Sequence, residues 1–417
     1  MKKLILTALL LTISTICFTQ ETNNFLQDAI KIYIDCDDCD MNFIREEIQF
    51  VNYVRDRKVA DVHIIFSDQN TGGGGEEYTV EFIGLGRFQN VNNELVFIKT
   101  KSDSEDDFRI QSVNTLRLGL VRYAAKTPIG KDISISYNKP QTEKVEEKDP
   151  WNNWVYSISG SGWLNGEKSR HYYSLDGAVS VRRITNEQKI FFSSDYSHSK
   201  NSYSDLDYET TSKYMNFYSS FINSMNDHWS YGGWLNARQS DYENLDLAIS
   251  LKPGIEYNIF PYSDYNKKQI RIQYFLAAEY GDYQQKTVYE RTNDKTINQS
   301  IVVAAEVIRS WGSISANITA SDYLVINKGV FQDLEKNKFT FYGRTSLNLY
   351  EGFSIGFFGY ISLIHDQISL PGGEVSTEEL LLQQRQLETQ YSYMGSLSLS
   401  YTFGSVYNNI VNPRFGG

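Results

Sequence analysis

The 417-residue sequence has few prolines (7), few cysteines (3) and, beyond its N-terminus, no long apolar run. A helix that crosses a bilayer needs about 20 mostly apolar residues, so a helical membrane protein is excluded. Half of the residues in a membrane-crossing β-strand are polar, so strands that cross a membrane are not excluded. Tyrosine (30) and phenylalanine (23) are abundant, which favours a protein built from many strands.

Positive charge is also scarce, since the formal net charge is −11. Met1-Lys2-Lys3 followed by the apolar stretch Leu4 to Ile16 has the basic and apolar regions of a secretory signal peptide, which we place at residues 1–20. Removing Lys2 and Lys3 with this signal changes the charge to −13. We therefore expect neither nucleic acid nor anionic lipid as a partner of the bulk surface.

Residues 21–137 have a mixed pattern that predicts a small α+β domain. Asp40 is a good N-cap for a first helix, whose apolar side would carry Phe43, Ile44, Ile48, Val51 and Val54. A second helix is expected from about Asp107 to the residues before Thr127-Pro128. The strands of this domain are expected at 31–35, 62–66, 78–82 and 95–98. The charged stretch 138–150 lacks an apolar period and is predicted to be a linker.

The clearest alternation of apolar and polar residues runs from Leu245 to Tyr280, where two long strands flank the turn Pro261 to Lys267. These strands are long enough to cross a bilayer obliquely. The same period predicts twelve strands over residues 151–403, joined alternately by tight turns and mostly longer polar loops. They are expected at 153–164, 172–184, 189–198, 211–224, 229–238, 244–260, 268–282, 299–310, 313–322, 338–349, 353–365 and 390–403.

The last of these strands alternates Leu397, Leu399, Tyr401 and Phe403 with small polar residues. In this it resembles the aromatic-ended terminal strand of outer-membrane β-barrel proteins, and the resemblance extends over about residues 150–403. It implies a transmembrane antiparallel β-barrel in contact with outer-membrane lipid, with short turns in the periplasm. The α+β domain and the tail 404–417 are then periplasmic, although family members usually end at the aromatic residue.

Cys36-Asp37-Asp38-Cys39 lies between a predicted strand and a predicted helix. Such a pair is redox-active where thiolate is stabilised, but the surrounding aspartates oppose thiolate formation. A metal site is a further alternative, although the spacing supplies too few ligands for a tetrahedral site. A local structural disulfide is the interpretation that we favour for an exported protein.

Three histidines are expected near the rim that carries the long loops: His171, His198 and His365. The stretch around His198 resembles outer-membrane phospholipase A, in which a serine follows the histidine by two residues, but Lys200 stands at that position here. This difference weakens the resemblance. A rim hydrolase using His198, or His365 with Asp366, is kept as a second alternative function.

Six charged residues of the predicted strands are expected to face the lumen: Lys252, Glu256, Arg271, Glu279, Glu306 and Arg344. If the Pro261 to Lys267 turn is symmetric, Glu256 lies opposite Arg271 and the two pair across strands. Mixed charge of this kind can brace or plug a narrow barrel, and it can equally line a small-solute channel.

The sequence thus predicts a mainly β protein, a transmembrane β-barrel of about twelve strands after a small α+β periplasmic domain. We expect a non-enzymatic structural or assembly component that docks a periplasmic or outer-membrane protein partner, with a porin-like channel as the first alternative. Candidate contact segments are Thr71–Gly75 and the tail Val406–Phe415. The glycines of the first segment lack the lysine of a phosphate-binding loop, and no cofactor or metal is expected.

Overall fold

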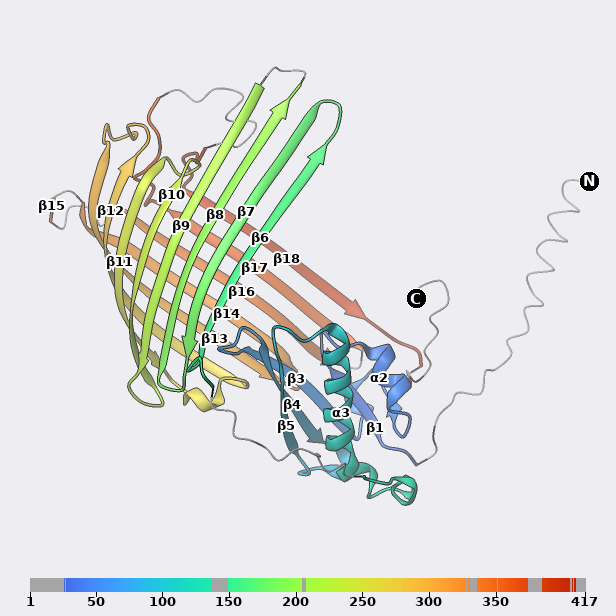
Figure 1. Cartoon of the computed structure of the whole chain (residues 1–417). Helices are drawn as coiled ribbons and strands as arrows, with labels where there is room; N and C mark the ends of the chain where they lie inside the picture. The colour runs from blue at the N-terminus through green and yellow to red at the C-terminus, as the bar shows by residue number, and fades with distance from the viewer. Residues whose placement is uncertain are drawn as a thin grey trace, which may run out of the picture.

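The computed structural model describes residues 26, 28–136, 149–204, 208–326, 329–330, 336–350, 352–373, 385–405, 407 and 409. It has two parts, a small α+β region followed by a large curved sheet of long strands (Figure 1). The predicted signal peptide, most of the linker and most of the tail lie outside the described residues.

The N-terminal region contains a five-stranded sheet in the order β2-β1-β3-β4-β5. Two α-helices accompany it, α2 (Met41–Glu47) and α3 (Glu105–Ala124), with 3-10 turns at Arg57–Val59, Gly86–Phe88 and Pro128–Asp132. Buried side chains of β1, β3, β4 and both helices form one apolar core between the helices and the sheet. The strands are β1 (Lys31–Asp35), β2 (Asn52–Tyr53), β3 (Val62–Asn70), β4 (Glu76–Gly84) and β5 (Asn93–Lys99).

The helix predicted to extend through Val51 and Val54 is shorter than expected. Helix α2 ends at Glu47, and Ile48 already has non-helical dihedral angles. The following residues form β2 instead, which pairs in parallel with β1. The prediction was wrong there because Val51 reaches the core from a bend, while Val54 is buried in a bridge with Tyr407 instead.

Helix α3 begins with a capping box. The Ser104 hydroxyl accepts a hydrogen bond from the Asp107 amide, and the Asp107 carboxylate accepts one from the Ser104 amide. These bonds satisfy two amides that the first helical turn leaves without partners. The hydrogen bonds from Ser104 also lower the pKa of the Asp107 carboxyl. The helix then buries Leu116, Leu120 and Tyr123 against the sheet.

The second part is one antiparallel sheet in which twelve strands follow one another in sequence order, with the two-residue strand β15 (Gly329–Val330) paired to β14. Figure 1 shows it curved, so that β6 to β9 lie in front of β14 to β18. The twelve strands are β6 (Trp154–Gly166), β7 (Arg170–Ile184), β8 (Gln188–Tyr203), β9 (Tyr208–Ser224), β10 (Trp229–Ser240), β11 (Leu245–Asn258), β12 (Lys268–Tyr283), β13 (Asn293–Arg309), β14 (Gly312–Ile326), β16 (Asn337–Tyr350), β17 (Phe353–Ile364) and β18 (Tyr391–Tyr401).

Each predicted strand corresponds to one of these twelve, so the predicted mainly β fold with a small α+β region before it is confirmed. Strands β8 and β13 extend several residues beyond the prediction at their loop ends. Their extra residues are largely polar, so the apolar period stops while the backbone pairing continues. In the described residues, β6 and β18 are the edges of this sheet and no ladder joins them.

The two faces of the large sheet differ in chemistry. On one face, apolar side chains of neighbouring strands are between 37% and 56% exposed: Leu247, Ile249, Leu251, Ile255, Ile272, Tyr274, Leu276 and Ile301. The opposite face carries the polar residues that alternate with them, together with buried Phe275 and Ala277. We call these the outer and the inner face. Within the described residues, no helix is both long and apolar enough to cross a membrane.

We predict that Gly119→Ala destabilises the N-terminal region. A methyl group at Gly119 would overlap the ring of Phe82 on β4, and overpacking of this kind costs about 1–3 kcal/mol. The measurement is thermal unfolding of this region in the detergent-solubilised full chain, followed by protease sensitivity. Gly73→Ala is the matched control, because the nearest atom to its added methyl group is a side-chain oxygen at 3.8 Å. Equal midpoints for both variants would contradict the close contact.

Candidate functional site

The site that the structure builds is the contact between the N-terminal region and one rim of the large sheet. The helices cover only one face of the five-stranded sheet, and residues on its other face would be open to water in an isolated domain. His63, Ile65 and Thr79 lie on that other face but are only 1%, 6% and 4% exposed. Figure 1 shows why, since this region lies against the end of the large sheet that carries the short turns, which we call the short-turn rim.

The turn between β11 and β12 makes the most polar part of this contact. The Tyr265 hydroxyl donates to Glu77 Oε1 at 2.7 Å, and the Asn266 amide group donates to Thr79 Oγ1 at 3.4 Å. Lys267 Nζ lies 2.7 Å from Glu94 Oε2. The hydrogen bond to Glu94 raises the pKa of Lys267, and burial together with the bond to Glu77 raises the pKa of Tyr265 to about 12.

Arg55 and Arg57 hold the rim by its main chain. The guanidinium of Arg57 donates to the carbonyl oxygens of Ser310, after β13, and Asn348, near the end of β16. That of Arg55 donates to the carbonyl oxygens of Thr402, Gly404 and Ser405, which follow β18. In the described residues neither arginine forms an ion pair within 4.0 Å, so both are used as multiple hydrogen-bond donors.

Further contacts extend the site to the first strands of the large sheet. Lys101 Nζ donates to Ser157 Oγ on β6 at 2.8 Å. In the glycine segment Thr71–Gly75, Gly72 lies against Ile184 and Gly74 lies near the Arg182 side chain, both on β7. This candidate contact segment therefore touches another part of the same chain.

The tail, the second candidate contact segment, also touches the N-terminal region. Its described residues Tyr407 and Asn409 lie beside β2 and the residue that follows it. The remaining residues of Val406–Phe415 lie outside the described part of the chain.

The six predicted lumen charges occupy one face of the large sheet. Lys252, Glu256, Arg271, Glu279 and Glu306 alternate with outer-face residues such as Leu251 and Ile272, and Arg344 lies opposite Phe358 on β17. Their neighbours on this face are aromatic as well as polar, since Lys252 Nζ lies 4.1 Å from the centre of the Phe275 ring. Trp234 meets the same ring edge to face.

The predicted pairing of Glu256 with Arg271 is wrong. Glu256 lies opposite Gln273, and Arg271 lies opposite Asn258. The turn is not symmetric, because a 3-10 turn at Tyr262–Asp264 shifts the register by two residues while each side chain stays on its face. Glu256 instead accepts hydrogen bonds from Tyr262 and Gln273.

The loops at the opposite rim contact one another. Asn244, between β10 and β11, donates to the carbonyl oxygens of Gln285 and Ser369 at 2.9 and 3.0 Å. Thr287 and Pro371 form an isolated antiparallel bridge. Asn244 and Thr287 are 3% and 1% exposed, so the loops after β10, β12 and β17 form one packed cluster.

Of the residues proposed for a hydrolase, only His365 and Asp366 are neighbours, and His198 lies elsewhere, on strand β8. His198 lies opposite Leu175, on the outer face, and its Nε2 lies 3.5 Å from the Tyr173 hydroxyl. Ser197 lies on the other face and donates to Asp176. At the rim opposite the short turns, the side chain of His365 is exposed, and burial raises the pKa of the Asp366 carboxyl. His171 lies near the start of β7, opposite Gly166 on β6 and Ser202 on β8.

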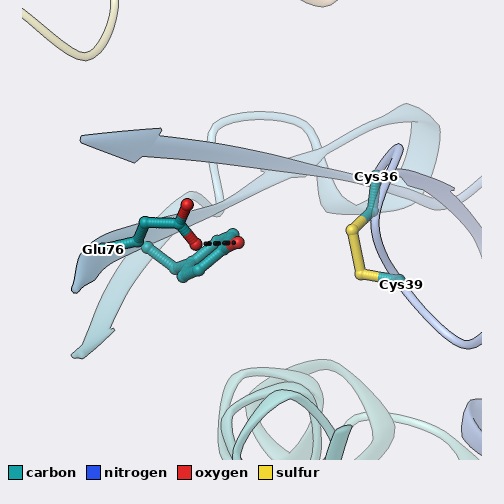
Figure 2. Close-up of a disulfide and its surroundings, with 4 residues drawn as sticks. Cys36, Cys39 and Glu76 are labelled. Atoms are coloured by element: carbon teal, nitrogen blue, oxygen red, sulfur yellow. Dashed lines mark hydrogen bonds between the residues drawn. A yellow bond between two sulfur atoms is a disulfide. The ribbon is translucent and has the colours of Figure 1, made fainter. Parts of the chain in front are cut away.

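Cys36 and Cys39 form a disulfide with an S–S distance of 1.95 Å and a Cα–Cα distance of 5.6 Å. Figure 2 shows it just after the end of β1, together with Glu76, the first residue of β4. Glu76 accepts a hydrogen bond from the Tyr78 hydroxyl at 2.8 Å. Across the described residues, no group of three or more histidine, cysteine or acidic side chains is arranged to hold a metal ion.

Comparisons with known proteins add little to this geometry. No family model matches the sequence, and no curated protein matches it. The translocator domain of the autotransporter NalP from Neisseria meningitidis is a structural match with 10% identity and a TM-score of 0.27, covering 60% of this chain and 88% of that chain. The β domain of the Bordetella autotransporter BrkA gives 7% identity, a TM-score of 0.25 and coverage of 60% and 98%. Scores this low support no functional argument.

We predict that the rim contact loosens at alkaline pH. The folded-state pKa values of Lys267 and Tyr265 are raised above their unfolded values of roughly 10. Their stabilising contribution is therefore complete below roughly pH 10 and is lost as the pH rises through the folded pKa values. The measurement is energy transfer between dyes attached beforehand at Asp132→Cys and Asp227→Cys, with reversal at pH 8 to exclude denaturation.

The matched variant is Tyr265→Phe, which removes the titrating hydroxyl but keeps the ring. It should show a smaller change between pH 10 and 12 than the parent protein. Energy transfer that stays constant to pH 12, or that already falls below pH 9, would contradict the role of these two groups.

Proposed function

We propose that this chain is an exported, non-enzymatic outer-membrane β-barrel whose N-terminal domain lies in the periplasm and docks a protein partner of the cell envelope. The observation that carries the proposal is the seating of this domain on the short-turn rim. A channel needs no such domain, whereas an assembly or structural component uses it to present a fixed surface below the membrane.

The membrane part of the proposal is supported by the outer face of the large sheet. Apolar residues of that face are exposed on strand after strand, and they include Leu164, Leu251, Tyr274 and Leu397. Contiguous apolar surface of this extent is unfavourable in water and favourable against lipid. In the antiparallel sheet, the strands between the edge strands β6 and β18 are hydrogen-bonded to a neighbour on both sides. Such pairing of backbone N–H and C=O groups is required in an apolar medium.

The periplasmic placement in this proposal is supported by the topology. An even number of strands brings both ends of the large sheet to the same rim, and that rim carries the short turns. The helices of the N-terminal domain lie on the side away from the rim contacts, and Ile110 and Leu118 of α3 are 43% and 68% exposed there. This side is therefore accessible to a partner while the sheet side rests on the rim.

We predict that a partner co-purifies with the tagged chain from detergent-solubilised membranes and is lost when residues 21–137 are deleted. The partner is read by mass spectrometry. The control is Arg55→Ala combined with Arg57→Ala, which removes contacts to the rim but keeps the domain on the chain. We expect the partner to remain with this control. A partner retained after the deletion, or none with the intact chain, would overturn the docking role.

A small-solute channel is the second candidate, and it is favoured by the charged inner face. Against it, the N-terminal domain lies on one rim and a packed loop cluster lies at the other. We therefore predict little ion conductance for the intact chain in planar bilayers. A large conductance whose ion selectivity changes with Glu256→Lys, but not with the outer-face change Ile255→Val, would replace the structural role with a channel.

A further inference from the structure

The outer edge of β2 is a place where backbone groups need a partner. The amides of Asn52 and Val54 donate toward β1, to the carbonyl oxygens of Ile30 and Ile32 at 2.8 and 2.9 Å. Because neighbouring residues of a strand alternate in direction, the Tyr53 amide points away from β1, at the edge of the five-stranded sheet. Edges of this kind accept an added strand.

The chain's own tail occupies this edge. Tyr53 N donates to Asn409 Oδ1 at 2.7 Å, and Asn409 Nδ2 donates to Asn52 Oδ1 at 2.9 Å. Two residues earlier in the tail, Tyr407 forms an antiparallel bridge with Val54. The ammonium group of Lys31 lies 5.9 Å from the centre of the Tyr407 ring.

The segment between β18 and this edge is held by Arg55. Its guanidinium donates to the carbonyl oxygens of Thr402 and Gly404 at 2.6 and 2.8 Å, and also to that of Ser405. These bonds reach only main-chain atoms, so Arg55 recognises the path of the backbone and not its side chains. The specific contacts come from Tyr407 and Asn409.

Burial agrees with an occupied edge. Asn52, Tyr53 and Val54 are 0%, 4% and 5% exposed, although they form the last strand of the sheet and the residue after it. Asn52 also binds both main-chain groups of Leu26, so this one side chain connects the beginning of the described chain with the tail.

We propose that the edge of β2 is a strand-acceptor site for an extended peptide with a tyrosine followed two residues later by an asparagine, and that its resident ligand is the tail that begins at Gly404. The site consists of Lys31, Asn52, Tyr53, Val54 and Arg55. Through this site the described tail residues Tyr407 and Asn409 connect the end of the last strand to the N-terminal domain. The proposal holds whether the chain is an assembly component or a channel.

The first test uses the full chain with Val54→Cys and Tyr407→Cys, purified from membranes under mild oxidation. We expect a disulfide between the two positions, detected by mass spectrometry of the digested protein. The control is Tyr407→Cys with Arg122→Cys, since Arg122 donates to Asn92 next to β5, at the opposite side of the sheet. A disulfide at equal yield in both pairs, or in neither, would overturn the proposal.

The second test measures the ligand specificity of the site. A chain that ends at Phe403 is mixed with a fluorescent peptide of residues 404–417, and binding is followed by anisotropy. We expect the peptide to bind, and a peptide with Tyr407→Ala and Asn409→Ala to bind about 10-fold or more weakly, because it loses two side-chain hydrogen bonds and the ring contact. Equal affinities, or no binding by a truncated chain that has inserted normally, would overturn the specificity. The cysteine test does not depend on the truncation.

Discussion

The constraint on which this structure depends is the pairing of backbone groups in strands whose side chains alternate between two faces. Each of the twelve long strands lies beside its neighbours in sequence order, so the position of one strand fixes the faces of the next. A shift by one residue would move the exposed apolar side chains to the inner face. The shift by two residues at the β11–β12 turn does not, which is why Glu256 keeps its face while it changes its partner.

The same constraint explains how the N-terminal domain is attached. A sheet with helices on one side has a second face and two edges, and all of them expose groups that seek partners. In this chain the rim turns meet the second face, and the tail covers one edge. The attachment is mostly polar, through Arg55, Arg57, Lys267 and Tyr265. Polar interfaces of this kind suit parts that fold separately and then dock.

The amino-acid sequence predicted the strands well, because their apolar period is long and unbroken. It predicted poorly wherever a contact decides the local structure. Val51 and Val54 fit a helical pattern, yet the residues after Val51 pair with β1 and, at Val54, with the tail. The rim contact was not predicted at all, since Arg55 and Arg57 donate to carbonyl oxygens, which no side-chain pattern reveals. The only local signal was the concentration of polar residues at Tyr265, Asn266 and Lys267, more than a tight turn needs.

The guanidinium groups of Arg55 and Arg57 donate hydrogen bonds to five carbonyl oxygens and, among the described residues, to no side chain of the rim. Every amino acid carries a carbonyl oxygen. The turns they contact are therefore free to change in sequence during evolution, provided that their length and path are kept. Insertions or deletions in these turns would be selected against far more strongly than substitutions.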